Sequence, residues 1–212
     1  MYPFTSFEHD EITKFADTLQ LISNIHEKID PKRNCTRTLE ATTFVFKFLA
    51  EECQFEGTVF FDCLGRRAEA SLYAAVFGVV ECISCEMYEP FVRRGQLLCG
   101  AFKPEDSKID IELGAFQDFF RFDATIIYID VAQLIDISPF VDEGYTTRIF
   151  FEMCTRTLPG SHCIVVSYNS TFSPQDDFDC KYVQVVHHTA ICRHTKDECY
   201  VYICKILSDM SV

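Results

Sequence analysis

The sequence has little that would place the protein in a membrane or outside the cell. No apolar run approaches the roughly 18 residues that a membrane-spanning helix needs. The first residues, MYPFTSFEHDEITKF, are polar and acidic, whereas a secretion signal is basic and then apolar. We therefore expect an intracellular protein in a reducing compartment, without membrane association.

Basic residues are scarce. The 19 Lys and Arg residues stand against 32 Asp and Glu, which gives a formal net charge of -13 at pH 7. A field of this sign repels phosphate backbones and anionic lipid heads. We expect no direct binding of nucleic acid and a protein partner that is basic, such as a histone or a Lys/Arg-rich subunit. The alternative is that the acidity only keeps a Phe-rich domain soluble.

Glycine and proline are also few, with eight and seven among 212 residues, and they are scattered. No linker tract or internal repeat interrupts the chain, and 48% of the residues are apolar, so one globular unit is expected. We assign residues 1–55 to an N-terminal helical segment packed on the core, and residues 56–212 to the main domain.

The minimal motifs of several enzyme classes are missing. There is no Gly-x-Ser-x-Gly, no Walker-type Gly-Lys-Ser/Thr and no His-Glu-x-x-His. We assign no catalytic residue.

Cysteine is abundant, at twelve residues, but most cysteines lie inside apolar runs, where a free thiol behaves as a small hydrophobe. Cys82 and Cys85 have the spacing of a zinc knuckle, yet a strand through them would turn the two side chains to opposite faces. The group His187, His188, Cys192, His194 and Cys199 matches no common zinc spacing. We predict core cysteines and no metal, with zinc as the alternative.

Hydrophobic periodicity predicts the fold class. Residues 10–28 and 37–53 carry apolar side chains at every third or fourth position, as amphipathic helices do. Ser138-Pro139 is typical of the start of another helix. Alternation of strands with helices, followed by two long strands, predicts a doubly wound, mostly parallel seven-stranded α/β sheet with a C-terminal antiparallel hairpin. The expected strands are 58–61, 79–85, 108–113, 124–129, 162–167, 181–190 and 199–207.

Three of these strands end in a carboxylate, at Asp62, Glu86 and Asp130. Doubly wound sheets bind ligands outside the carboxyl ends of their strands, so the three side chains are expected around one crevice. Glu86 follows Asp62 by 24 residues, close to the interval at which an acidic residue holds the ribose of a nucleotide cofactor. A magnesium site and ordinary strand-end turn chemistry are the alternatives.

Several segments resemble one enzyme family. DCLGRRAEASLYAA at 62–75 resembles D-L-G-S-G-V-G-x-x-x-L-x-A-A of the Dot-one (disruptor of telomeric silencing) histone lysine methyltransferases, which have a class I S-adenosylmethionine fold. The segments at 111–116, 124–130 and 158–167 resemble that family's L-x-x-G-D-F, V-I-F-V-N-N and K-x-G-x-x-I-V-S. The resemblance is collinear over about residues 40–207.

The resemblance implies S-adenosylmethionine as the cofactor. Asp62 would then face its amino-acid end, Glu86 its ribose and Phe116 its adenine, and Asp130 would complete the set. The resemblance also implies a nuclear location, with the cytoplasm as the alternative.

The departures from the family motifs fall on these functional positions. Leu64, Arg66 and Ala68 replace the three motif glycines, Ala115 replaces an Asp, and Asp130-Val131 replaces Asn-Asn. Glycine lets the backbone turn tightly and approach the ligand, whereas Leu64 and Arg66 would fill that space.

From these losses we expect a catalytically inactive interaction or scaffold subunit in a nuclear or chromatin-linked complex. The alternative is an active, divergent protein (histone) lysine methyltransferase that keeps the cofactor on Asp62, Glu86, Phe116 and Asp130. Arg66 and Arg67 are expected on a solvated loop, with an anion site as the alternative.

Overall fold

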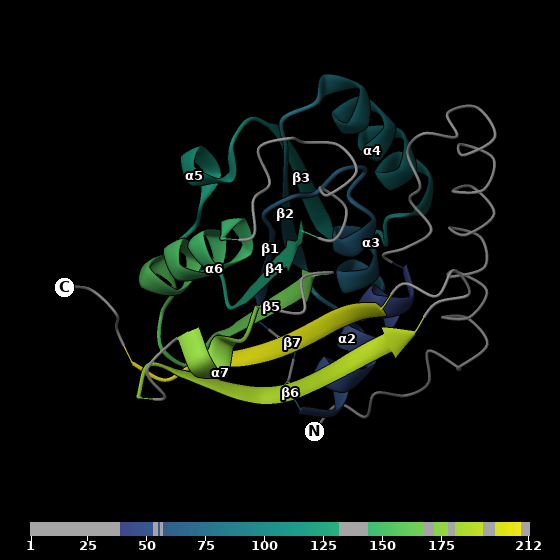
Figure 1. The fold of residues 1–212 in the computed structure, drawn as a ribbon. Helices are drawn as coiled ribbons and strands as arrows, with labels where there is room; N and C mark the ends of the chain where they lie inside the picture. The colour runs from purple at the N-terminus through teal and green to yellow at the C-terminus, as the bar shows by residue number, and fades with distance from the viewer. Residues whose placement is uncertain are drawn as a thin grey trace.

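The central element is a seven-stranded sheet (Figure 1). The computed structural model describes residues 39–52, 55, 57–131, 144–167, 172–177, 181–192 and 198–208. The strand order is β3-β2-β1-β4-β5-β7-β6; β7 is antiparallel to β5 and to β6, and the other pairs are parallel. This confirms the predicted mostly parallel sheet with a C-terminal hairpin. The strands are β1 (Val59–Asp62), β2 (Glu81–Glu86), β3 (Lys108–Leu113), β4 (Ile126–Asp130), β5 (His162–Ser167), β6 (Val183–Cys192) and β7 (Glu198–Ile206).

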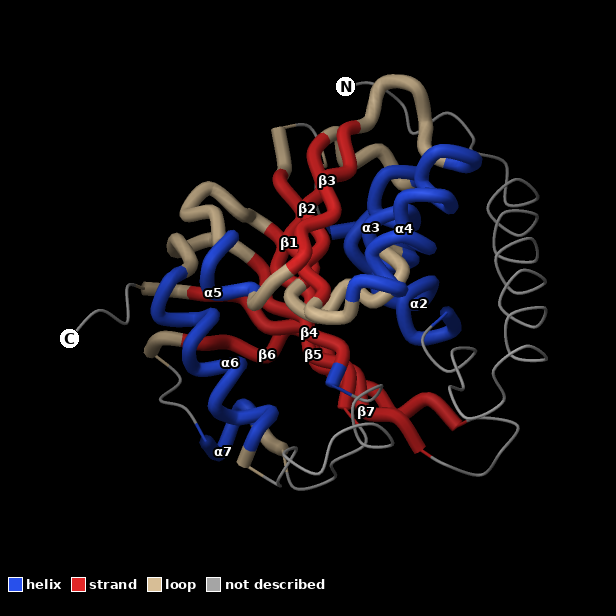
Figure 2. The backbone as a smooth tube through the Cα atoms, turned by 90° about the horizontal axis from the view of Figure 1, so that it is seen from above, coloured by secondary structure: helices blue, strands red, loops and turns tan. Residues whose placement is uncertain are grey.

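Helices cover both faces of this sheet. Figure 2 shows α2, α3 and α4 on one side and α5, α6 and α7 on the other. The predicted helix at 10–28 and the predicted helix start at Ser138-Pro139 lie outside the described residues. No helix in the described ranges is long and apolar enough to cross a membrane. The helices are α2 (Leu39–Glu52), α3 (Glu69–Val76), α4 (Glu89–Phe102), α5 (Phe116–Phe119), α6 (Tyr145–Arg156) and α7 (Pro174–Asp177).

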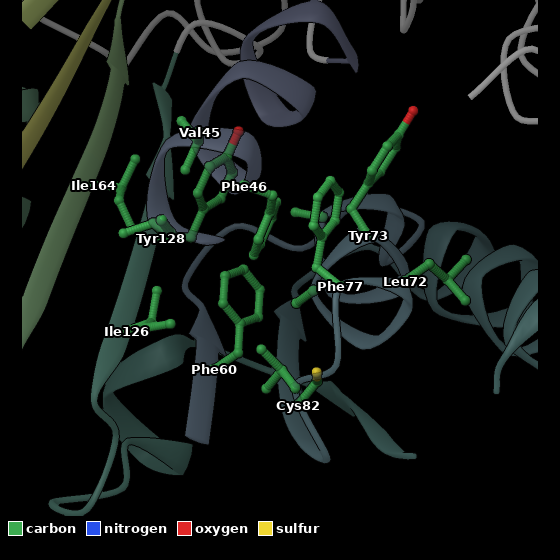
Figure 3. Packing of buried hydrophobic residues seen from close by; sticks show 14 of the residues in the cluster. Val45, Phe46, Phe60, Leu72, Tyr73, Phe77, Cys82, Ile126, Tyr128 and Ile164 are labelled. Atoms are coloured by element: carbon green, nitrogen blue, oxygen red, sulfur yellow. The ribbon is translucent and has the colours of Figure 1, made fainter. Parts of the chain in front are cut away.

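Alternation along each strand divides the core into two layers. Phe60 faces α2 and α3, where its ring lies 5.4 Å from that of Phe46 and 6.0 Å from that of Tyr128 (Figure 3). Its neighbour Phe61 points to the other face, against Phe120 at 5.2 Å. Each such ring contributes about 1.5–3 kcal/mol by leaving water. The α2 helix belongs to this first layer, so it packs on the sheet as an integral part of the core.

The cysteines follow the same alternation. Cys82 lies in the layer under α2, α3 and α4, while Cys85 lies in the opposite layer, as the strand pattern predicted. The cysteines whose side chains the structure describes are free and buried, and burial raises the pKa of the Cys85 and Cys99 thiols to about 12. Within the described part of the chain no group of His, Cys, Asp and Glu is arranged to hold a metal ion. His194 lies outside that part.

Candidate functional site

The three predicted carboxylates lie at one edge of the sheet. Asp62, Glu86 and Asp130 are the last residues of β1, β2 and β4, and these strands are parallel neighbours with β1 in the middle. Parallel strands end at the same edge, so the topology brings the three residues together. We call this the carboxyl edge.

Asp62 and Asp130 are almost fully enclosed, with exposed fractions of 2% and 1%. The backbone N–H of Leu64 donates to one carboxylate oxygen of Asp62 at 3.3 Å, and the Ser84 hydroxyl donates to the other at 3.4 Å. Burial raises the pKa of Asp62 well above its ordinary value, and the charges of Asp130, Glu69 and Glu86 raise it further. A site with this balance of charge favours a cationic group.

Glu86 is held by its own turn. The backbone N–H of Tyr88 donates to its carboxylate at 2.7 Å. Burial raises the pKa of Glu86, whereas hydrogen bonds from the backbone of Tyr88, Met87 and Arg66 and the charge of Arg66 oppose that rise. Beside it, Met87 is 77% exposed and Leu113, the register partner of Glu86 on β3, is 51% exposed. The carboxylate thus lies next to exposed apolar side chains.

The loop after β1 keeps a glycine-like backbone without the glycines. Arg66 and Ala68 have φ angles of 44° and 58°, in the left-handed region that favours glycine. The N–H of Gly65 donates to the carbonyl of Cys85 at 2.7 Å, and the N–H of Ala68 donates to the carbonyl of Gly65 at 2.6 Å. Two of the three positions that lack the motif glycine therefore still adopt its conformation.

The side chains of this loop pack into the protein. The prediction of a solvated Arg pair was wrong, because Arg66 and Arg67 are both buried. The Arg66 guanidinium lies 5.6 Å from the centre of the Phe91 ring, and the Nε of Arg67 lies 2.6 Å from a carboxylate oxygen of Glu69. Leu64 packs against the core layer under α6.

Phe116 begins α5 and is buried in the layer that includes Ile83 and Cys85. Two residues before it, the N–H of Gly114 donates to the carbonyl of Glu86 at 3.0 Å, so the start of α5 is tied to the carboxyl edge. Its contact with an adenine stays a prediction.

Two residues that the sequence pattern missed also lie at this edge. Tyr145 is the first residue of α6, which runs from the carboxyl edge back toward the start of β5. Tyr145 is half-buried, and burial raises the pKa of its hydroxyl. Cys63, the residue directly after Asp62, is among the groups that raise this pKa further. Arg148 lies over its ring at 5.9 Å. The sequence carried no motif for this pair.

The fold has counterparts among solved structures. An rRNA methylase from Streptococcus thermophilus matches with a TM-score of 0.58 and 9% identity, over 78% of this chain and 95% of that one. The tRNA (m1A22) methyltransferase of B. subtilis matches with a TM-score of 0.58 and 11% identity, over 77% and 66% of the two chains. A candidate RNA methyltransferase from Pyrococcus horikoshii gives 0.58 and 14%, over 80% and 84%. No protein-family model and no curated protein matches the sequence.

These comparisons correct the expected family. The similar structures are RNA methylases of bacteria and archaea, so the assignment to the Dot-one histone methyltransferases was wrong. The expected function, an inactive chromatin scaffold, and its alternative, a protein-lysine methyltransferase, were also wrong. The similar structures are described as enzymes that act on RNA. The segments at 62–75 and 124–130 misled because a strand, a terminal acid and a small-residue helix are what any βα unit of this fold requires.

The predicted basic partner and nuclear or cytoplasmic location stay predictions. What the sheet order, the helices on both faces and the similar structures establish together is the fold: the chain has the class I methyltransferase fold.

Proposed function

We propose that the protein is an S-adenosylmethionine-dependent methyltransferase that acts on RNA. The observation that carries the proposal is the carboxyl edge, where the buried Asp62 and Asp130 and the anchored Glu86 meet in a fold shared with RNA methylases.

The charges and surfaces at this edge fit the cofactor. S-adenosylmethionine carries an ammonium group, a ribose with two hydroxyls and an adenine, and its sulfonium supplies the methyl group that is transferred. Asp62, whose carboxylate neighbours leave it in a negative environment, suits the ammonium. Glu86 suits the ribose hydroxyls, because a carboxylate accepts hydrogen bonds from both.

The apolar side chains beside Glu86 suit the adenine. Met87, directly after β2, and Leu113, the last residue of β3, are both exposed, and a flat base that covers them would remove apolar surface from water. Phe116, at the start of α5, and Asp130, at the end of β4, complete the proposed set.

The backbone of the loop supports an active site more than a vestigial one. Holding Arg66 and Ala68 in the left-handed region costs roughly 1–2 kcal/mol for each residue. Strain of this kind clusters at ligand sites. The side chains of Leu64 and Arg66 pack against the core and against Phe91.

The acceptor proposed is RNA, as in the similar structures. This proposal departs from the expectation of no direct nucleic-acid binding, which rested on the net charge alone. The net charge of -13 opposes a long nucleic acid, so a short single-stranded stretch held through few phosphates suits this protein best.

Transfer of a tritiated methyl group from S-adenosylmethionine to a pool of tRNA and rRNA tests the proposal. We expect label in RNA with the wild type, and a roughly 10- to 100-fold loss of rate in Glu86→Ala, which removes charged hydrogen-bond acceptors from the ribose. Glu105→Ala, an exposed carboxylate in the turn before β3, is the matched control and should keep the wild-type rate. No label in RNA, at any protein concentration, would contradict the proposal.

A further inference from the structure

Arg66 stands where glycine would suit the backbone best, yet it carries a long side chain that is buried. Its φ of 44° lies in the left-handed region that favours glycine, and only 6% of the residue is exposed. Its guanidinium carbon lies 5.6 Å from the ring centre of Phe91, within the range of a cation–π contact. Backbone strain beside a ligand site points to a role for the residue that bears it.

The loop that carries Arg66 is fixed against two neighbouring elements. The N–H of Gly65 donates to the carbonyl of Cys85 at 2.7 Å, which ties the loop to the end of β2. On α4, a Cβ atom added to Gly95 would stand 3.0 Å from the backbone carbonyl carbon of Arg67, so the helix packs directly on the loop. Arg66, between these two contacts, therefore has a defined place beside the last residue of β2.

The turn that holds Glu86 and the side chain of Arg66 meet at the same ring. The N–H of Tyr88 donates to the Glu86 carboxylate at 2.7 Å, and the Tyr88 ring lies edge-on to that of Phe91, with 5.2 Å between the ring centres. Burial raises the pKa of Glu86, whereas the N–H of Tyr88 and the charge and backbone of Arg66 lower it. Phe91 thus supports both the carboxylate's turn and the cation that acts on the carboxylate.

Arg66 brings positive charge to an edge where carboxylates repel one another. The charge of Glu86 is among those that raise the pKa of Asp62 on β1, so the two acids disfavour each other's ionised form. The other charged groups on the elements around Glu86 are Glu112 on β3, Asp118 on α5, the ion pair Arg67–Glu69 at the start of α3, the ion pair Glu89–Arg93 on α4 and, on the same helix, Arg94. The charge of Arg66 offsets the repulsion at Glu86.

We propose that Arg66 is a positioning residue for Glu86, whose carboxylate it holds ready for the ribose of the cofactor. An ionised carboxylate only accepts hydrogen bonds, so it can take one from each ribose hydroxyl, whereas a protonated carboxyl is a weaker acceptor. By its charge and by its place on Phe91, Arg66 keeps Glu86 in the accepting form. The inference rests on the proposed function and concerns the same cofactor site.

Carbon-13 NMR titration of the Glu86 carboxyl in the ligand-free full chain tests this role without a ligand. Arg66→Met keeps an apolar stem over Phe91 and removes the charge, so the pKa of Glu86 should rise above its wild-type value. Arg66→Lys keeps the charge and should return the pKa toward that value. Phe91→Leu keeps Arg66 but removes the ring beside its guanidinium, so the same pKa should rise. Arg93→Met, which removes an exposed arginine of α4, is the matched control and should leave it unchanged.

Nucleoside binding measures what the arginine does for the ribose. Adenosine carries the ribose and base of the cofactor without its amino-acid end, and 2′-deoxyadenosine lacks one ribose hydroxyl. At a pH between the Glu86 pKa values of the two proteins, the wild type should prefer adenosine by roughly 10- to 100-fold and Arg66→Met by roughly 3- to 10-fold, because hydrogen bonds to a charged acceptor are about twice as strong as those to a neutral one. A residue with only a structural role would weaken both nucleosides equally and leave the preference unchanged.

Equal pKa values of Glu86 in the wild type, Arg66→Met and Arg66→Lys would overturn the positioning role, as would a wild-type preference for adenosine in Arg66→Met. Titration of the wild type with S-adenosylhomocysteine separates this failure from failure of the proposed function. If the wild type binds it while the pKa values are equal, the cofactor site stands and the role of Arg66 falls. If the wild type binds neither it nor adenosine, the proposed function falls, and the role of Arg66 falls with it even where the pKa of Glu86 responds.

Discussion

Gly65 lies so close to Ser84 that a Cβ atom added to it would stand 1.7 Å from the Ser84 hydroxyl oxygen. The same Cβ would be 3.3 Å from the backbone nitrogen of Cys85, whose carbonyl accepts the Gly65 N–H. This contact fixes the loop after β1 against the end of β2. The glycine is therefore required for close packing.

Gly65→Ala should lower the free energy of unfolding by about 1–3 kcal/mol or more, because the methyl group overpacks a backbone contact. Chemical denaturation measures it. Gly100→Ala is the control: its added Cβ meets nothing within 4 Å, and alanine is favoured over glycine in a helix by about 0.5–1 kcal/mol. Equal effects of the two substitutions would contradict the packing described for Gly65.

The Arg66→Gly variant should be more stable toward unfolding than the Arg66→Ala variant. Both substitutions remove the contact with Phe91, but only glycine adopts a φ of 44° without strain. The free energy of unfolding of Arg66→Gly should therefore exceed that of Arg66→Ala by about 1 kcal/mol. At Arg93, an exposed residue of the α4 helix, the order should reverse by a similar amount. Thermal or urea unfolding of the four variants measures these differences. If the alanine variant were the more stable one at position 66 as well as at position 93, Arg66 would not be left-handed.

Asp62 should make the protein less stable as pH rises. Its folded-state pKa is raised by burial and by neighbouring carboxylates, so the folded protein binds the proton more tightly than the unfolded chain. Stability therefore falls between the ordinary pKa, about 3.9, and the raised value, and the loss is complete above it. Asp62→Asn should consequently melt at a higher temperature than the wild type at pH 7.

The difference should shrink as pH approaches about 4, where the unfolded carboxyl also takes up its proton. Calorimetric melting curves across this range measure it, with Asp118→Asn, an exposed carboxylate of α5, as the control. If the Asp62→Asn variant had a lower melting temperature than the wild type at pH 7, the fold would stabilise the ionised carboxylate, contrary to this prediction.

The buried thiols should resist alkylation in the native state. Only the thiolate reacts, and burial raises the pKa of Cys85 and Cys99 to about 12, so little thiolate forms at neutral pH. Mass spectrometry after iodoacetamide treatment should find these two cysteines modified only after denaturation. Modification at the rate of an exposed thiol in native protein would contradict their burial. The same protection is expected at Cys63, Cys82, Cys154, Cys163 and Cys204.

The strands could be predicted from the sequence where composition and period agree. The alternating run Lys108–Leu113 and the apolar run His162–Ser167 were located to the residue. Cys82 and Cys85 were placed on opposite faces by the two-residue period alone. Strand ends also identify which carboxylates meet, since parallel strands finish at one edge.

Loop conformation and long-range contacts were beyond that reasoning. The stretch Leu64-Gly65-Arg66 does not predict a left-handed backbone at Arg66, because that conformation favours glycine and position 66 carries an arginine. Arg66 was predicted in solvent for its charge, yet its ring contact comes from Phe91, on another element. Tyr145 and Arg148 lie at the carboxyl edge because α6 begins there after β4, and no sequence motif indicates this position.

Calorimetric titration of the full chain with S-adenosylhomocysteine at neutral pH tests directly whether the carboxyl edge binds the cofactor. We predict one-to-one binding in the micromolar range by the wild type, weakened by roughly 10- to 100-fold in Glu86→Gln and unchanged in Glu105→Gln. No heat from the wild type at millimolar ligand, or equal binding by all three proteins, would contradict a cofactor site at the carboxyl edge.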